Sequence, residues 1–115
     1  MPEEQVKGTF PYIAPEIVAK RPYNELSDVY SYGMVIWNIL TRKHPAHLLS
    51  KKEKEEMALT QVYQPEIPHW CPQEFVNLIK NCWLENPVDR FSFNQITRYI
   101  LSNPTSPPII PDENK

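Results

Sequence analysis

Four side chains able to bind a metal ion lie in two short motifs near the middle of the sequence. The motifs are His44-x-x-His47 and His69-x-Cys71, and imidazole and thiolate are both ligands of Zn²⁺. Their spacing fits no familiar zinc module, and such residues more often have surface or packing roles. The sequence therefore predicts surface or packing roles for these four residues and no metal site.

Phosphate binding by a glycine-rich loop is a second possible chemistry. The sequence has only two glycines, Gly8 and Gly33, together with thirteen prolines. The dinucleotide fingerprint and the P-loop both need several glycines close together, because the backbone must approach the phosphates. We therefore expect no nucleotide-binding loop and no bound cofactor in this chain.

The overall composition limits the class of protein. The chain has 115 residues, of which 41% are apolar and 23% charged, as expected for one small globular domain. A formal charge of −2 gives no basic surface for nucleic acid, and no apolar run approaches the roughly 20 residues that cross a bilayer. Two cysteines are too few for a disulfide scaffold. We expect a reduced, cytoplasmic chain with no nucleic-acid or membrane partner.

The strongest predicted helix follows Ser27, with Asp28 in its first turn, and continues through Leu40 to a stop at Pro45. Its apolar residues cover nearly the whole circumference, so we expect it to be buried at the centre of the fold. Gly33 would allow another backbone to approach closely. Before this helix, prolines make residues 1–26 mostly irregular, apart from a short helix within residues 14–20.

Three further helices are expected after Pro45. Ser50 and Glu53 form a capping-box pattern that opens a charged surface helix to about Leu59. The next helix begins at Pro72 and ends at Asn86-Pro87, with an apolar stripe of Phe75, Leu78, Ile79, Cys82 and Trp83. Ser92 and Gln95 open the last helix, whose apolar side carries Phe93, Ile96, Ile100 and Leu101. No alternating strand pattern occurs, so the chain is expected to be helical.

Three ordered blocks of residues resemble the second half of a protein-kinase domain. The run Gly8-Thr9-Phe10-Pro11-Tyr12-Ile13-Ala14-Pro15-Glu16 is similar to the end of an activation segment with its Ala-Pro-Glu element. The run Ser27-Asp28-Val29-Tyr30-Ser31-Tyr32-Gly33, followed by Trp37, resembles the start of the central helix of the C-terminal lobe. Cys82-Trp83, Asn86-Pro87 and Arg90 are similar to the late C-lobe pattern of tyrosine kinases and the tyrosine-kinase-like group.

The resemblance implies a mainly α fold, the helical C-terminal lobe part of a protein-kinase-like fold, with the N-lobe and the catalytic loop absent. Residues 1–102 would be the partial kinase domain and residues 103–115 a proline-rich flexible tail. A complete parent domain would use ATP and Mg²⁺ to phosphorylate serine or threonine in proteins. The 115 residues contain no His-Arg-Asp, Asp-Phe-Gly or Val-Ala-Ile-Lys motif, so the chain alone is predicted to be inactive and to carry no catalytic residue.

The resemblance also implies a substrate-binding segment of Gly8, Thr9, Phe10 and Tyr12. Thr9 is similar to the threonine that contacts the catalytic base in serine/threonine kinases, which favours a parent of that group. Phe10 to Ile13 would form the floor for the substrate residue that follows the phosphoacceptor. Ordinary turn and packing roles remain open for these residues, and Thr9 and Tyr12 are also candidate phosphoacceptors.

Three charged residues match structural positions of the family. Glu16 and Arg90 would form a buried ion pair between the Ala-Pro-Glu element and the loop before the last helix. Asp28 matches the aspartate that anchors the backbone of the catalytic loop. In the isolated chain we favour a simpler role for Asp28, as a carboxylate stabilised by the helix N-terminus.

The expected partners are a protein substrate, another kinase or a regulator. The charged run from Lys51 to Glu56 is interpreted as a solvated helix face, in a region where kinases often dock substrates or regulators. Two alternatives remain open, namely a non-catalytic interaction module and a gene fragment without function. Self-association through exposed apolar surface is also expected, because the central helix would lack one of its usual neighbours.

Overall fold

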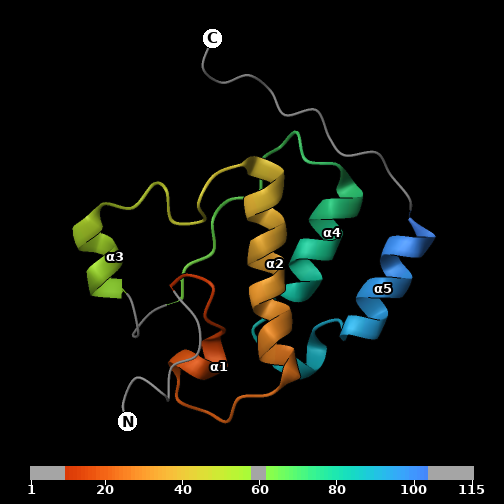
Figure 1. Cartoon of the computed structure of the whole chain (residues 1–115), viewed down its shortest axis with the longest axis horizontal. Coiled ribbons are helices and arrows are strands. Elements are labelled where there is room, and N and C mark those ends of the chain that lie inside the picture. Colours follow the sequence, from red (N-terminus) through yellow and green to blue (C-terminus); the bar gives the residue numbers. More distant parts are fainter. Residues whose placement is uncertain (1–9, 58–61, 104–115) are drawn as a thin grey trace.

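The computed structural model of the protein describes residues 10–57 and 62–103. Helices are the only regular elements in this part of the chain (Figure 1), which confirms the helical fold class. No helix among these residues is long and apolar enough to cross a membrane. The elements are α1 (Pro15–Val18), α2 (Glu25–Thr41), α3 (Lys51–Met57), α4 (Gln73–Cys82), the 3₁₀ helix η2 (Pro87–Asp89) and α5 (Phe93–Ser102).

The central helix α2 begins earlier than predicted. Asn24 is its N-cap, and its side-chain oxygen accepts hydrogen bonds from the backbone N–H groups of Leu26 and Ser27 at 2.8 and 3.3 Å. The Ser27 hydroxyl accepts in return from the Asn24 backbone N–H at 3.4 Å. The predicted start at Ser27 is therefore wrong, because Asn24 and Ser27 together form the capping box. The helix ends at Thr41, where Arg42 takes a left-handed φ of 60°.

The hydrophobic core lies mainly between α2 and α4, which run side by side in Figure 1. Gly33 of α2 stands where α4 ends, as its small size requires. A Cβ atom at Gly33 would lie 2.8 Å from Cys82 Cβ and from the Trp83 indole. The close approach predicted at Gly33 is present, but it is made by side chains rather than by backbone. The fully buried core side chains include Val29, Tyr30, Met34, Ile79 and Cys82.

The helices α2 and α5 are less buried than their sequences suggest. On α2, Val35 is 40% exposed and Ile39 is 66% exposed. On α5 only Ile96 is buried, and three apolar side chains remain exposed, namely Phe93, Ile100 and Leu101. The helix α2 lies in the core as predicted, but its apolar circumference is only partly covered in the described part of the chain. On α2, Val35 and Ile39 lie on the side of the helix away from its buried residues, which include Val29, Met34 and Trp37.

The remaining helix boundaries follow the predicted caps. Ser50 and Glu53 exchange backbone-to-side-chain hydrogen bonds of 2.8 and 3.0 Å before α3, which has no buried residue. Ser92 and Gln95 do the same at 2.7 and 3.1 Å before α5. The predicted end of α3 near residue 59 lies outside the described residues.

The helix α4 is shorter than predicted. It ends at Cys82, and Asn86 instead caps η2 by accepting from the Val88 backbone N–H at 3.2 Å. Its predicted apolar stripe packs into the core, except that Phe75 is only half-buried.

Candidate functional site

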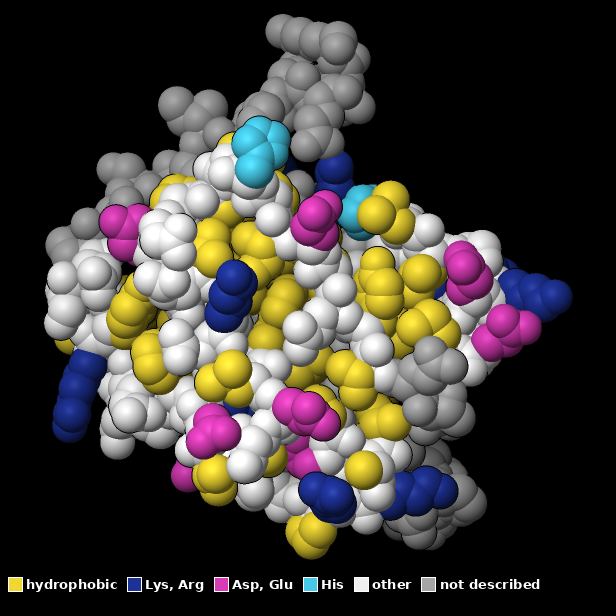
Figure 2. Space-filling model, turned by 180° about the vertical axis from the view of Figure 1, so that it is seen from behind, with side chains coloured by type: hydrophobic (Ala, Val, Ile, Leu, Met, Phe, Trp, Pro, Cys, Tyr) yellow, Lys and Arg dark blue, Asp and Glu magenta, His cyan; other side chains and the backbone are white. Residues whose placement is uncertain are grey.

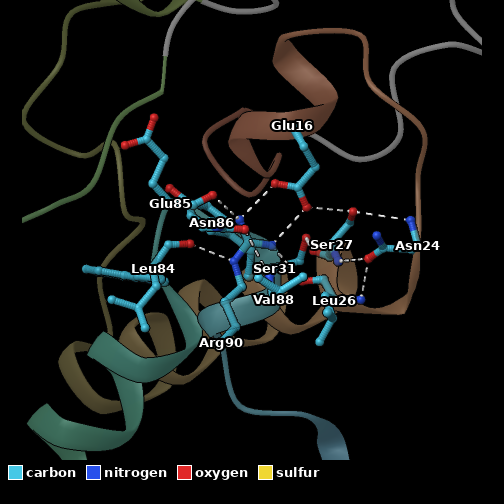
Figure 3. A network of polar contacts seen from close by, with 12 residues as sticks. Glu16, Asn24, Leu26, Ser27, Ser31, Leu84, Glu85, Asn86, Val88 and Arg90 are labelled. Atoms are coloured by element: carbon cyan, nitrogen blue, oxygen red, sulfur yellow. Dashed lines mark hydrogen bonds and ion pairs between the residues drawn. The ribbon is translucent and has the colours of Figure 1, made fainter.

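The candidate site is organised around a bidentate ion pair between Arg90 and Glu16 (Figure 3). The two terminal nitrogens of Arg90 each donate to one carboxylate oxygen of Glu16, both at 2.8 Å. The side chains are 0% and 5% exposed. Arg90 follows η2 and Glu16 lies in α1, so the pair joins two elements that are distant in sequence. This planar fork-to-carboxylate geometry is the strongest form of an arginine ion pair.

Arg90 uses all five of its N–H donors. Besides the two bonds to Glu16, its Nε donates to the carbonyl oxygen of Leu84 at 2.7 Å. The terminal nitrogens also donate to the carbonyl oxygens of Leu26 at 2.7 Å and Glu85 at 3.2 Å. A guanidinium has five such donors, so its capacity is filled in a fixed geometry. Arg90 therefore connects α1, the first turn of α2 and the loop after α4.

The Glu16 carboxylate is held in its charged form. Burial by itself would raise the pKa of Glu16, since desolvation disfavours the charge. Hydrogen bonds from Arg90 and from the Ser27 hydroxyl, the latter 2.7 Å long, outweigh that effect together with the charge of Arg90. The pKa of Glu16 is consequently lower than its ordinary value. This arrangement is architectural, because every polar atom of the pair is turned toward the protein interior.

Two residues of this network were not singled out from the sequence for their part in it. Ser27 appeared only as a helix cap, yet it also donates to Glu16. Tyr30 lies below the Arg90 guanidinium, 5.1 Å from ring centroid to Cζ, and its hydroxyl accepts from Gln64 Nε2 at 3.2 Å. The spacing Asn24-x-x-Ser27 is the signal that would have placed the cap correctly. Nothing local in the sequence indicates the contact between Tyr30 and Arg90.

The predicted substrate floor is described from Phe10 onward. The Phe10 ring lies 6.4 Å from the Tyr63 ring, and the Tyr12 ring meets the His44 ring edge-on at 5.8 Å. Ser31 of α2 donates to the Tyr12 carbonyl oxygen at 2.7 Å, which fixes this segment on the central helix. Burial raises the pKa of Tyr12 and lowers that of His44. Gly8 and Thr9 lie outside the described residues.

Asp28 stands in the first turn of α2 and is exposed. Its carboxylate accepts a hydrogen bond from the Tyr23 hydroxyl. Both observations agree with a carboxylate stabilised at a helix N-terminus. The role as an anchor of the catalytic loop stays an implication of the resemblance.

The four candidate zinc ligands lie in two loops, and His47 and His69 border the same groove. His44 and His47 lie in the loop after α2, where His44 Nδ1 accepts from the Ala46 backbone N–H at 3.1 Å. His69 and Cys71 precede α4, and burial raises the pKa of the Cys71 thiol. Among the described residues no group of three or more His, Cys, Asp or Glu side chains could hold a metal ion.

The residues present do not fit ATP or Mg²⁺ either. A phosphate cradle needs adjacent glycines, whereas the two glycines of this sequence are 25 positions apart, at 8 and 33. The described carboxylates form no metal-binding group. ATP and Mg²⁺ are therefore assigned to the complete domains of the family that the motifs resemble.

Comparison with known proteins shows which family this sequence resembles. The sequence model for protein tyrosine and serine/threonine kinases matches residues 2–100. The dual specificity protein kinase shkC of Dictyostelium discoideum is 40% identical over 95 residues, which cover 82% of this chain and 19% of that protein. A probable serine/threonine-protein kinase of the same organism is 43% identical over 89 residues, covering 77% of this chain and 8% of that protein.

A third relative from Dictyostelium discoideum, cyclic GMP-binding protein C, is 37% identical over 95 residues, covering 77% of this chain and 4% of that protein. The chain thus spans about a fifth or less of the length of the relatives it matches. The described helices are consistent with a kinase C-lobe, and the family match extends over nearly the whole sequence. The chain belongs to the protein tyrosine and serine/threonine kinase family.

Proposed function

We propose that this chain is the substrate-facing part of the C-lobe of a kinase domain that phosphorylates serine or threonine in proteins. The ion pair between Glu16 and Arg90 is the observation that carries the proposal. It fixes α1 to the C-terminal half of the lobe, and α1 directly follows the segment of residues 10–13. A rigidly held segment at this position is what a surface for the substrate peptide requires.

The preference for serine and threonine rests on two supports. Thr9 follows Gly8, as in the serine/threonine kinases that the motif resembles. Two of the relatives are named as a dual specificity and a probable serine/threonine-protein kinase. The complete domain would accordingly transfer the terminal phosphate of ATP to a hydroxyl side chain of a protein substrate.

The 115-residue chain by itself would transfer no phosphate. Phosphoryl transfer needs residues that hold the nucleotide, bind the metal ions and orient the acceptor hydroxyl. The motifs that supply these residues do not occur in the sequence. The chain therefore contributes substrate contacts and architecture, and the chemistry belongs to the rest of a complete domain.

A phosphorylation assay tests this proposal. The purified 115-residue chain is incubated with ATP, Mg²⁺ and peptides that carry serine, threonine or tyrosine as the only acceptor, beside the complete domain encoded at the same locus. We expect incorporation into serine and threonine peptides by the complete domain alone. Transfer by the 115-residue chain, or transfer by the complete domain to tyrosine only, would contradict the proposal.

A second candidate function is a non-catalytic interaction module. The observation in its favour is α3, which has no buried residue and stands apart from the other helices in Figure 1. Its exposed Lys51 and Lys52 would contact a protein partner or a complete kinase. Replacing Lys51 and Lys52 by glutamate would then abolish capture of that partner without changing the unfolding temperature, whereas retained capture would exclude α3 as the docking element.

A further inference from the structure

A groove of about 450 Å³ lies where α2 ends, between the loop after α2 and the segment of residues 65–70. The aromatic wall is continuous, since the rings of Trp37 and His47 are 6.1 Å apart at 33°. Trp37 is fixed there by its Nε1, which donates to the Glu66 carbonyl oxygen at 3.0 Å. The apolar and aromatic lining consists of Trp37, His47, Leu48, Pro65, Pro68 and Trp70.

An exposed leucine borders this groove. Leu48 is 75% exposed although it borders a depression lined by aromatic rings and prolines. Figure 2 shows hydrophobic side chains beside histidine and basic side chains near the upper edge of the rear face. Aromatic-lined grooves of this kind bind extended proline-rich segments, which lose little conformational entropy because they are already extended.

We propose that the C-terminal tail of this same chain binds in the groove, with residues 107–111 against its aromatic wall. The sequence there is Pro107-Pro108-Ile109-Ile110-Pro111, which is apolar throughout and favours the extended polyproline conformation. Two isoleucines between prolines supply the side chains that would cover Leu48 and Trp70. This inference does not depend on the proposed kinase function.

The tail begins close enough to the groove. Figure 1 shows the ends of α2 and α5 and the start of α4 at the same end of the molecule. The Tyr99 hydroxyl of α5 donates to the Glu74 carbonyl oxygen of α4 at 2.9 Å. From Tyr99 to Asn103 is about 6 Å of helix, and from Glu74 back to Trp70 is at most about 14 Å of chain. Residues 104–111, extended, reach about 25 Å, which is similar to the longest separation that these steps and one tyrosine side chain allow.

The charges of the tail and of the groove are complementary. Asp112 and Glu113 follow the apolar run directly. Lys43 lines the groove and the exposed Arg42 precedes it, whereas Glu66 is the one acidic residue among the lining residues. A tail that enters with residues 107–111 on the aromatic wall would bring its acidic residues toward the exposed Arg42, a rim contact that weakens with added salt.

The proposal is tested on the full 115-residue chain by NMR of its three tryptophan indole N–H groups. Trp37 and Trp70 line the groove, and Trp83 is an internal reference because it does not line this groove. The tail variant combines Ile109→Ser with Ile110→Ser, and its matched control combines Thr105→Ala with Ser106→Ala. We expect the isoleucine variant, and not the control, to shift the Trp37 and Trp70 signals while Trp83 stays in place. Unchanged Trp37 and Trp70 signals, or an equal shift of Trp83, would overturn the proposal.

A substitution in the groove tests the proposal independently of the tail variant. Leu48→Ser is expected to shift the same two signals in the same direction as the tail variant, whereas Val88→Ser is not. Val88 is a matched control because it is also 75% exposed and lies in η2, away from the groove. Opposite or absent shifts in Leu48→Ser would count against the groove as the site.

Competition by a synthetic peptide of residues 104–115 distinguishes the chain's own tail from other occupants. We expect this peptide to bind the isoleucine variant at least about tenfold more tightly than the natural chain, because a tethered tail competes at an effective concentration near 1 mM. Equal binding to both chains would overturn the proposal. Signals of Trp37 and Trp70 that move on dilution of the natural chain would assign the groove to a second copy instead.

Discussion

Arg90 and Glu16, which are 74 positions apart in the sequence, meet in a bidentate ion pair that is almost wholly buried. The pair shares its surroundings with the Ser27 hydroxyl and with three backbone carbonyl groups. A buried ion pair has little net value compared with a well-packed apolar pair, but the loss of one partner leaves a charge buried without compensation. The loss of stability on a single substitution therefore measures how well the network excludes water from the ion pair.

The first prediction concerns the removal of one partner. Glu16→Ala leaves the Arg90 guanidinium buried without its counter-charge, and should lower the free energy of unfolding by about 3–5 kcal/mol. Equilibrium urea unfolding of the natural chain and the variant measures the difference. The matched control is Glu74→Ala, since Glu74 is an exposed glutamate in the first turn of α4. A loss below about 1 kcal/mol in Glu16→Ala would show that water reaches the pair.

The second prediction concerns pH. The pKa of Glu16 is lower in the folded chain than its ordinary value, so the unfolded chain binds this proton first as the pH falls. The stabilisation is fully present above the ordinary glutamate pKa of about 4.3 and is lost as the pH falls through the folded-state value. The stability of the natural chain should consequently decrease more steeply below pH 4.3 than that of Glu16→Gln. If the free energies of unfolding of the two chains fell in parallel below pH 4.3, Glu16 would not be the source of this pH dependence.

The third prediction concerns the contact between α2 and α4. A Cβ atom at Gly33 would lie 2.8 Å from Cys82 Cβ and the Trp83 ring, and neither is the end of a flexible side chain. Overpacking of this kind costs about 1–3 kcal/mol, against a gain of up to about 1 kcal/mol in helix propensity. Gly33→Ala should therefore lower the melting temperature despite its better propensity. Val35→Ala, at an exposed position of the same helix, should leave it nearly unchanged; a rise in Gly33→Ala would mean that Trp83 moves aside easily.

The fourth prediction concerns the exposed apolar side chains of α2 and α5. Ile39 and Leu101 are 66% and 75% exposed, and the Phe93 ring lies 5.8 Å from the Tyr32 ring, which connects the two helices. Apolar surface of this kind promotes association. The purified chain should bind a hydrophobic dye and sediment faster as its concentration rises, and Ile39→Lys with Leu101→Lys should reduce both effects. A monomer without dye binding at all concentrations would contradict the expectation of self-association.

Local sequence patterns predicted the helices well where the signal is itself local. The capping boxes at Ser50 and Ser92 are present because a hydroxyl and a carboxylate or amide three residues later complete them without tertiary help. The same rule explains the error at the start of α2. Asn24 and Ser27 form a capping box of this spacing. The prediction used only Ser27, as the residue before the helix, and Asp28, as the acidic residue of the first turn.

Tertiary contacts were harder to predict. The meeting of Glu16 and Arg90 was implied by resemblance, whereas the stacking of Tyr30 on Arg90 has no local signal because the partners are far apart in sequence. The burial of α2 and α5 was overestimated for a related reason. Periodicity shows which side of a helix is apolar, but only the neighbouring elements decide how much of that side is covered.

The central claim is that this chain works as part of a complete kinase domain, and the intact mass of the endogenous protein tests it most directly. The endogenous protein is captured with an antibody to residues 104–115 and its intact mass is compared with the 13.5 kDa of this chain. We predict a substantially larger mass, sufficient for the nucleotide-binding and catalytic motifs. A mass of 13.5 kDa would contradict the claim and leave the interaction module as the function.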